Sequence, residues 1–260
     1  SGLAIGNLVG SNIANILLVL GVSGLIIRIK SNSDTPSSDG WVLLIGTVAF
    51  VAIAIGGVFE FNHGLALILL FVGFLFYSYV RGSKSNSQQS SGDYGDEVDD
   101  LRGVPSRIPV ASLFLLVGFA GLVGGSELLV DGSVSIARSF GVSEAAIGLT
   151  IIAFGTSLPE LATSVVAVYR KQTDIAFGNI VGSNIFNAVG IMGVISMITA
   201  VPVPPRIVFF DMWIMVITTL IFMPFVVGNK KYLGKITAAF YLMLYFTYIA
   251  AIGIGIKSFI

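Results

Sequence analysis

The chain has 260 residues, of which 55% are hydrophobic and only 11% are charged, and its mean hydropathy is +0.94. A soluble domain would be about a quarter charged, so this composition indicates an integral membrane protein embedded in a lipid bilayer. The 14 basic and 14 acidic residues balance, which gives no charge bias toward nucleic acid. No cysteine is present, and this excludes disulfides, thiolate metal sites and cysteine nucleophiles.

Apolar segments long enough to cross a bilayer recur along the chain, given that a helical crossing takes about 20 apolar residues. They cover residues 5–27, 41–58, 64–80, 108–129, 142–169, 175–198, 207–227 and 235–256. The sequence therefore predicts an all-α polytopic membrane protein with eight crossings.

A polar stretch from Gly82 to Ser106 separates the third crossing from the fourth. Its serine, glutamine, glycine and acidic residues cannot bury enough apolar surface to fold, so we expect a disordered linker. The acidic run Asp93–Asp100 lacks the alternating ligands of an EF-hand, which argues against a calcium loop. Alternating crossings put 11 of the 14 Lys and Arg residues on the side of this linker, so the linker is predicted to be cytoplasmic.

The decapeptide GNLVGSNIAN at residues 6–15 returns almost unchanged as GNIVGSNIFN at residues 178–187. Over residues 6–26 and 178–198, 11 of 21 positions are identical. The two copies lie on the first and sixth crossings, so they traverse the membrane in opposite directions. Inverted repeats of this kind are typical of transporters, in which the two halves share a site near the midplane.

The repeat also predicts the domain organisation. Crossings one to three match crossings six to eight, while the fourth and fifth have no upstream counterpart. Symmetry then predicts two further helices before Ser1, and ten in the intact protein. We expect residues 1–81 to be the remainder of the first repeat, residues 82–106 the linker, and residues 107–260 the second repeat of five helices.

Within each copy of the decapeptide, a serine and an asparagine lie one helical turn apart on one face. These four oxygen-bearing residues are Ser11, Asn15, Ser183 and Asn187. They could complete a cation site. The alternative is that the glycines only let helices pack closely, with serine and asparagine forming hydrogen bonds between helices.

The fifth crossing reads IGLTIIAFGTSLPELATSVVAV and holds a proline and an acid near its middle. Pro159 lacks a backbone N–H and should break the helix, which is tolerated at membrane depth only beside a cavity or ligand. The Glu160 carboxylate is unfavourable at the bilayer centre by at least about 2.5 kcal/mol, and Thr156 and Ser157 share its face. Such oxygens suit a hard cation such as Na⁺ or Ca²⁺. The alternative is a protonated Glu160 retained for packing.

These motifs resemble the alpha-repeats of the sodium/calcium exchanger branch of the calcium/cation antiporter superfamily. AFGTSLPELATS followed by GNIVGSNIFN resembles the second repeat, and GNLVGSNIAN resembles the latter half of the first. The resemblance implies an inverted-repeat exchanger fold in which Glu160 is the principal calcium-binding carboxylate of its repeat. It further implies Na⁺ and Ca²⁺ oxygens from Thr156 and Ser157, a Na⁺ ligand in the Ala153 carbonyl, and polar partner-helix positions at Ser11, Asn15, Ser183 and Asn187.

Two features bear on the coupling ion. Proton-coupled relatives carry an acid soon after the glycine–asparagine pair, where this chain has Gly10 and Gly182, so sodium coupling is favoured. Potassium-dependent members carry Asp at the position of Asn187, which argues against potassium co-transport. The GTSLPE-like segment of the first repeat is not in the chain, so the symmetry-related carboxylate is missing from the predicted site.

We therefore expect an antiporter that exchanges Na⁺ for Ca²⁺ by alternating access in a prokaryotic inner membrane, with no cofactor beyond the transported ions. A proton/calcium exchanger of the same fold is the alternative. A serine or HExxH-type intramembrane protease is excluded because the lone histidine, His63, lies outside the membrane core, and an aspartyl protease would need a second aspartate at depth.

Overall fold

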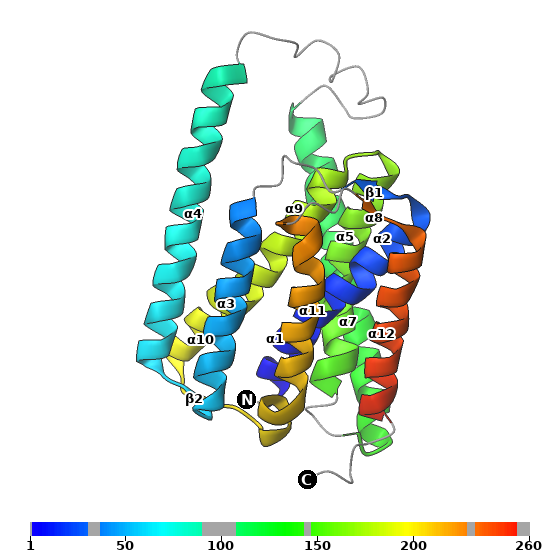
Figure 1. Ribbon diagram of the computed structural model, residues 1–260. Coiled ribbons are helices and arrows are strands. Elements are labelled where there is room, and N and C mark those ends of the chain that lie inside the picture. The colour runs from blue at the N-terminus through cyan, green and yellow to red at the C-terminus, as the bar shows by residue number, and fades with distance from the viewer. Residues whose placement is uncertain (1, 31–36, 90–107, 143–146, 228–231, 254–260) are drawn as a thin grey trace.

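The computed structural model describes residues 2–30, 37–89, 108–142, 147–227 and 232–253, and helices dominate it (Figure 1). Its first half consists of α1 (Gly2–Ala14), a π-helical turn (Asn15–Val19), α2 (Leu20–Ile26), β1 (Ile29–Lys30), α3 (Ser37–Ile55), β2 (Val58–Phe59) and α4 (Phe61–Gln89). The first three of these elements form one continuous helical crossing.

The second half begins with the long helix α5 (Ile108–Ser139). It continues with a π-helical turn (Gly148–Ile152), α7 (Ala153–Thr156), α8 (Leu158–Tyr169), α9 (Thr173–Ile185), a π-helical turn (Phe186–Ile191), α10 (Met192–Ile198), β3 (Val201–Pro202), a π-helical turn (Ile207–Asp211), α11 (Met212–Val226), β4 (Tyr232–Leu233) and α12 (Lys235–Gly253).

The described residues contain the predicted number of crossings. Seven helices are long and apolar enough to span a membrane, and the bent pair Leu149–Thr156 and Leu158–Tyr169 forms the eighth. The bend of 46° falls at Ser157, directly before the turn that holds Pro159. The all-α polytopic fold and the break in the fifth crossing are thus confirmed.

Two boundaries differ by eight residues or more from the sequence prediction. Helix α4 continues to Gln89, so residues 82–89 are helical rather than linker, because extending an existing helix is far easier than starting one. The rest of the expected linker, residues 90–106, lies outside the described residues. Helix α5 runs ten residues beyond the predicted end at 129 and ends before Gly141, whose positive φ of 74° forms the helix stop.

The inverted repeat is visible in the backbone. A π-helical turn follows α1 and a second one follows α9, at equivalent positions of the repeated sequence. Strand β1 pairs antiparallel with β4, and β3 pairs antiparallel with β2, so the strand after each repeated helix joins the opposite half of the chain. The two halves are therefore interlocked rather than merely placed in contact.

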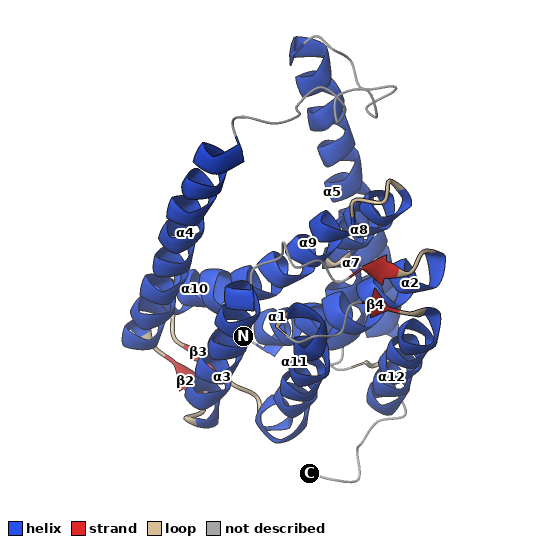
Figure 2. Cartoon of the chain, turned by 45° about the horizontal axis from the view of Figure 1, so that its top comes forward, coloured by secondary structure: helices blue, strands red, loops and turns tan. Residues whose placement is uncertain are grey.

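Helices also pack against the opposite half of the chain, since α2 packs on α12 and α10 packs on α4 (Figures 1 and 2). Glycines at matching repeat positions permit both approaches. A Cβ on Gly21 would lie 2.7 Å from Leu242, and one on Gly193 would lie 2.9 Å from Ile68. Real Cβ atoms do not approach so closely, so the backbone at each glycine packs directly against a side chain of the partner helix.

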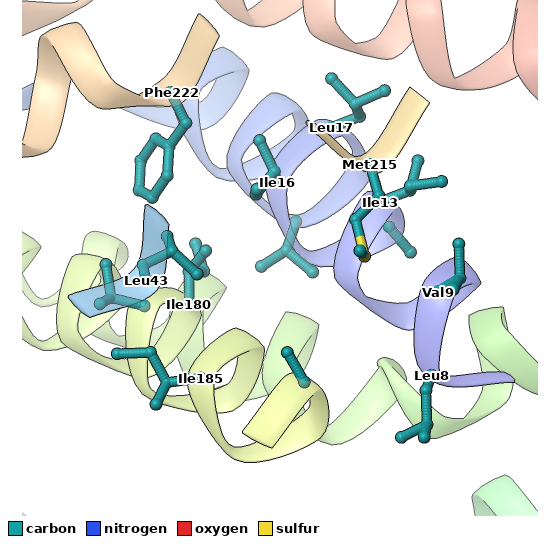
Figure 3. Close-up of a cluster of buried hydrophobic side chains, with 14 of the residues drawn as sticks. Leu8, Val9, Ile13, Ile16, Leu17, Leu43, Ile180, Ile185, Met215 and Phe222 are labelled. Carbon is teal, nitrogen blue, oxygen red and sulfur yellow. The ribbon is translucent and has the colours of Figure 1, made fainter. Parts of the chain in front are cut away.

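The core lies around α1 and α9. Ile13 and Ile16 of the first crossing, Ile180 and Ile185 of α9, and Phe222 of α11 are all buried in one cluster (Figure 3). Packing in a bilayer gains little from hydrophobicity alone, so close side-chain contact and interhelical hydrogen bonds hold these helices together. The helices of this core also carry the polar residues of both repeats.

Candidate cation site

Four asparagines join the two repeats by a closed set of hydrogen bonds. Asn12 Nδ2 donates to the Asn184 carbonyl oxygen at 3.3 Å, and Asn184 Nδ2 donates to the Asn12 carbonyl oxygen at the same distance. Asn15 Nδ2 donates to Asn184 Oδ1 at 3.1 Å, and Asn187 Nδ2 donates to Asn12 Oδ1 at 3.1 Å. Residues related by the repeat make the same bonds, so a pseudo-two-fold axis passes through this asparagine cluster.

A hydroxyl cluster lies where α1 meets α7. The Oγ1 atom of Thr156 lies 2.8 Å from Ser11 Oγ and 2.9 Å from Asn7 Oδ1. Both hydroxyls also reach the Ala153 carbonyl oxygen, at 3.2 Å from Thr156 and 3.5 Å from Ser11. Thr156 is exposed, while Ser11 is buried. Three predicted residues, Ser11, Ala153 and Thr156, are therefore in direct contact.

The carboxylate of Glu160 lies in the first turn of α8, facing α9. Ser183 Oγ donates to Glu160 Oε1 at 3.4 Å. Asn179 Nδ2 donates to the Glu160 carbonyl oxygen at 3.1 Å and to Ser164 Oγ at 3.0 Å. A helix N-terminus favours negative charge, so the break before α8 places the carboxylate where the backbone stabilises it.

Six buried side-chain oxygen atoms have no hydrogen-bond partner among the described residues, and three of them belong to predicted site residues. These three are Asn15 Oδ1, Ser157 Oγ and Glu160 Oε2, and the others are on Ser23, Ser78 and Asp211. A buried oxygen without a partner is unfavourable by about 1–3 kcal/mol, so a bound cation that contacts the three site oxygens would relieve this cost. Carboxylate, amide and hydroxyl oxygens are the donors that a hard cation prefers, so the residues present fit a cation such as Na⁺ or Ca²⁺.

The elements that carry these oxygens pack together. The π-helical turn that begins at Asn15 contacts both α8 and α9, and α8 packs along α9. No group of three His, Cys, Asp or Glu side chains forms a metal cluster within the described part of the chain. Among the described residues, the candidate site thus combines one carboxylate, Glu160, with neutral oxygens around it.

Sequence reasoning missed several polar residues that hold this region together: Asn7, Asn12, Ser164, Asn179 and Asn184. Four of them could have been found, because Asn7 matches Asn179 and Asn12 matches Asn184 in the repeat. Identity between repeats at a polar position indicates a bond that both halves make. Ser164 has no such counterpart in the chain.

Asp211 is the last residue of the π-helical turn that precedes α11. Its side chain is fully buried. Tyr248 Oη donates to Asp211 Oδ1 at 3.0 Å, and Arg206 Nε lies 3.5 Å from Oδ2. Arg206 and Tyr248 therefore stabilise this carboxylate in place of water. The sequence could not indicate the contact with Tyr248, because that residue lies 37 positions away from Asp211.

Comparison with known proteins shows which family and which relatives this chain is similar to. The chain matches the profile of the sodium/calcium exchanger protein family over residues 1–80 and 110–253. Inner membrane protein YrbG of Escherichia coli is 33% identical over 85% of this chain and 67% of its own length. Sodium/calcium exchanger MaX1 of Methanosarcina acetivorans is 30% identical over 93% of this chain and 78% of its own. Ca(2+)/H(+) antiporter ChaA of Bacillus subtilis is 27% identical over 71% of this chain and 56% of its own.

A solved structure extends the likeness to the fold. The sodium-calcium exchanger NCX_Mj, soaked with Na⁺ and Sr²⁺, matches with a TM-score of 0.73 and 31% identity, over 96% of this chain and 76% of that chain. The family match covers most of the sequence, and the structural match covers nearly all of it. The chain therefore belongs to the sodium/calcium exchanger family, as a multi-pass integral membrane cation exchanger.

Proposed function

We propose that the protein exchanges Na⁺ for Ca²⁺ by alternating access, with Glu160 as the main charged ligand of both ions. The observation that carries this proposal is the set of three buried, unpartnered oxygens on Asn15, Ser157 and Glu160. The Glu160 carboxylate and the neutral oxygens around it can bind either Ca²⁺ or Na⁺, so the two ions compete for the same atoms. Competition for shared ligands is what couples their opposite movements.

The neighbouring contacts suit this role. Ser11 and Thr156 hydroxyls can turn their protons away from an arriving cation, which frees the Ala153 carbonyl and both hydroxyl oxygens. Ser183 donates to one oxygen of Glu160 and leaves the other available. Inverted repeats joined at a common centre let the two halves open alternately to either side.

A proton/calcium exchanger remains the second candidate, and the relative named as a Ca(2+)/H(+) antiporter favours it. The two candidates differ in the ion gradient that drives transport. Calcium uptake should be measured in vesicles that contain the purified exchanger, first with an imposed sodium gradient and then with an imposed proton gradient. Uptake driven by sodium and not by protons is expected, and uptake driven only by protons would contradict sodium coupling.

The Asn187→Asp variant tests the charge of the site. In the wild type, Asn187 Nδ2 donates to Asn12 Oδ1 at 3.1 Å. An aspartate at residue 187 would instead place a carboxylate oxygen against Asn12 Oδ1. An additional carboxylate at a buried site that already holds acidic groups cannot stay ionised cheaply, so it should take up a proton or recruit another monovalent cation. We expect calcium flux that has become sensitive to pH or to potassium, measured in the same vesicles.

Asn187→Ala is the matched control, because it removes the amide without adding charge. Its flux should fall without acquiring pH or potassium dependence. If the calcium flux of the wild type, Asn187→Asp and Asn187→Ala responds in the same way to pH and in the same way to potassium, Asn187 lies outside the ion site.

The second carboxylate is proposed to come from a helix upstream of residue 1. A Cβ on Gly10 would lie 2.7 Å from the Ala153 Cβ and 2.8 Å from the Leu149 oxygen. Gly182 is its partner in the repeat, and no described atom lies within 4 Å of a Cβ built there. Pseudo-two-fold symmetry favours a counterpart of Leu149–Ala153 against Gly182, followed by a Gly-Thr-Ser-x-Pro-Glu-like stretch.

Gly182→Ala checks this arrangement. In the exchanger that includes the upstream coding sequence, the added methyl should clash with the proposed helix and impair calcium flux. In residues 1–260 purified alone, the same substitution should leave the thermal stability unchanged, and the wild-type segment should give no sodium-dependent flux. Robust exchange by residues 1–260, or an upstream sequence without this motif, would overturn the proposal.

A further inference from the structure

The asparagine cluster orients its own members across the repeats. Asn15 Nδ2 is held by Oδ1 of Asn184, and Asn187 Nδ2 is held by Oδ1 of Asn12. Each bond therefore links the decapeptide of one repeat to that of the other. We propose that Asn12 and Asn184 are positioning residues, which turn the carboxamide oxygens of Asn187 and Asn15 toward the transported ion. The inference rests on the proposed cation site and adds residues that do not themselves touch the ion.

The physical need arises from the symmetry of the carboxamide group. Rotating an asparagine carboxamide by 180° exchanges an acceptor oxygen for an NH₂ group of nearly the same shape. An NH₂ group turned toward a cation would repel it, whereas the oxygen binds it. A site that uses asparagine must therefore fix which end faces the ion.

Backbone carbonyls supply a fixed reference for this orientation. The Asn184 amide nitrogen donates to the Asn12 carbonyl oxygen at 3.3 Å, and a carbonyl oxygen can only accept. This bond fixes Oδ1 of Asn184 as the free end, and Oδ1 can in turn accept only the NH₂ group of Asn15. Asn15 Oδ1 is left buried and without a partner among the described residues.

The mirror-related bonds do the same for the other half. Asn12 donates to the Asn184 carbonyl oxygen at 3.3 Å, and its Oδ1 accepts from Asn187 at 3.1 Å. Asn12 also lies 3.7 Å from the sulfur of Met215 on α11, which holds it from a further side. The geometry thus predicts crossed pairs, in which Asn184 acts through Asn15 and Asn12 acts through Asn187.

The test uses Asn184→Leu, which keeps the approximate volume and removes every hydrogen bond. Residues that orient metal ligands typically change metal affinity by about 10–100-fold, so the apparent KM for Ca²⁺ should rise by about tenfold or more. The maximal rate should change much less, because the ligands themselves remain. Sodium-driven Ca²⁺ uptake by the reconstituted exchanger gives both values.

Two further variants separate positioning from folding. Ser196→Ala removes a buried hydroxyl whose one hydrogen bond within the described residues goes to the Met192 carbonyl of its own helix, and it should leave the KM unchanged. Asn184→Asp in its protonated form has nearly the shape of asparagine and can still donate one hydrogen bond to the Asn12 carbonyl and accept one from Asn15, so it should recover most of the lost affinity. Should Asn184→Leu fail to fold, Asn12→Leu and Asn184→Asp still test the proposal through the same KM measurement.

Double-mutant cycles test the crossed pairing. Asn184→Leu should be strongly non-additive with Asn15→Ala and nearly additive with Asn187→Ala, when Ca²⁺ affinity is read from direct ⁴⁵Ca²⁺ binding. A role in packing alone would give the same coupling to both asparagines, or no change in KM, and either result overturns the inference. Glu160→Gln in parallel distinguishes the two proposals, because intact binding in that variant contradicts the cation site itself.

Discussion

Replacing Glu160 with glutamine should abolish sodium-driven calcium exchange in a protein that still folds. Glutamine keeps the shape and an oxygen that can accept from Ser183, and the bond from Asn179 goes to the backbone carbonyl of residue 160 in either case. The charge is the only large difference. At an effective dielectric constant of 20, a unit pair 4 Å apart is stabilised by about 4 kcal/mol, and a divalent ion loses more than this when the carboxylate is removed. The affinity for Ca²⁺ should therefore fall by about a thousandfold or more.

Initial rates of ⁴⁵Ca²⁺ uptake into vesicles provide the measurement, and the elution profile and thermal stability of the purified variant check its folding. Removing a charge from membrane depth should leave the stability unchanged or raise it. Glu60→Gln is the matched control, since Glu60 is exposed between β2 and α4 and its side chain has no role in the proposed site. Transport at the wild-type rate by Glu160→Gln would refute the assignment of the site.

Much of this architecture could be predicted because local sequence determines it. Apolar length gave the eight crossings, and the chemistry of Pro159 gave the break in the fifth, since a proline acts on its own helix. The repeat of residues 6–15 at 178–187 indicated the inverted symmetry that the exchanged strand pairs display. These features depend on few residues that are close in the chain.

Other features depend on contacts that no local pattern encodes. The partners of Asn15 and Asn187 are Asn184 and Asn12, which lie 169 and 175 residues away. The π-helical turns at Asn15–Val19 and Phe186–Ile191 shift the helix register without a proline or glycine at their first position. Tertiary packing selects such turns, which often occur at functional sites. The roles assigned to the eight site residues stay predictions, although the structure brings Ser11 into contact with Thr156 and Ser183 into contact with Glu160.

Gly10→Ala should impair calcium exchange almost as severely as Glu160→Gln, although it adds only one methyl group and no polar atom. The new Cβ would lie 2.7 Å from the Ala153 Cβ and 2.8 Å from the Leu149 carbonyl oxygen. Backbone atoms cannot turn aside as a flexible side chain can, so α1 must move away from Leu149–Ala153. Overpacking of this kind typically destabilises by about 1–3 kcal/mol.

The movement would also open the cation site. Ser11 follows Gly10 directly, and its hydroxyl lies only 2.8 Å from that of Thr156. Separating α1 from α7 by even a fraction of an ångström should break this contact and withdraw oxygens that Na⁺ is proposed to use. We therefore expect a loss of sodium-driven Ca²⁺ uptake that exceeds the loss of thermal stability, with both measured on the same purified preparation.

Gly73→Ala in α4 is the control for adding a methyl group to a membrane helix, because no described atom lies within 4 Å of a Cβ at that position. Alanine favours a helix over glycine by about 1 kcal/mol, so this variant should be unchanged or slightly more stable. The double variant Gly10→Ala with Ala153→Gly removes the contact between the two Cβ atoms but keeps the one with the Leu149 oxygen. Partial recovery of transport is expected, and full activity of Gly10→Ala alone would show that α1 does not need its close approach to α7.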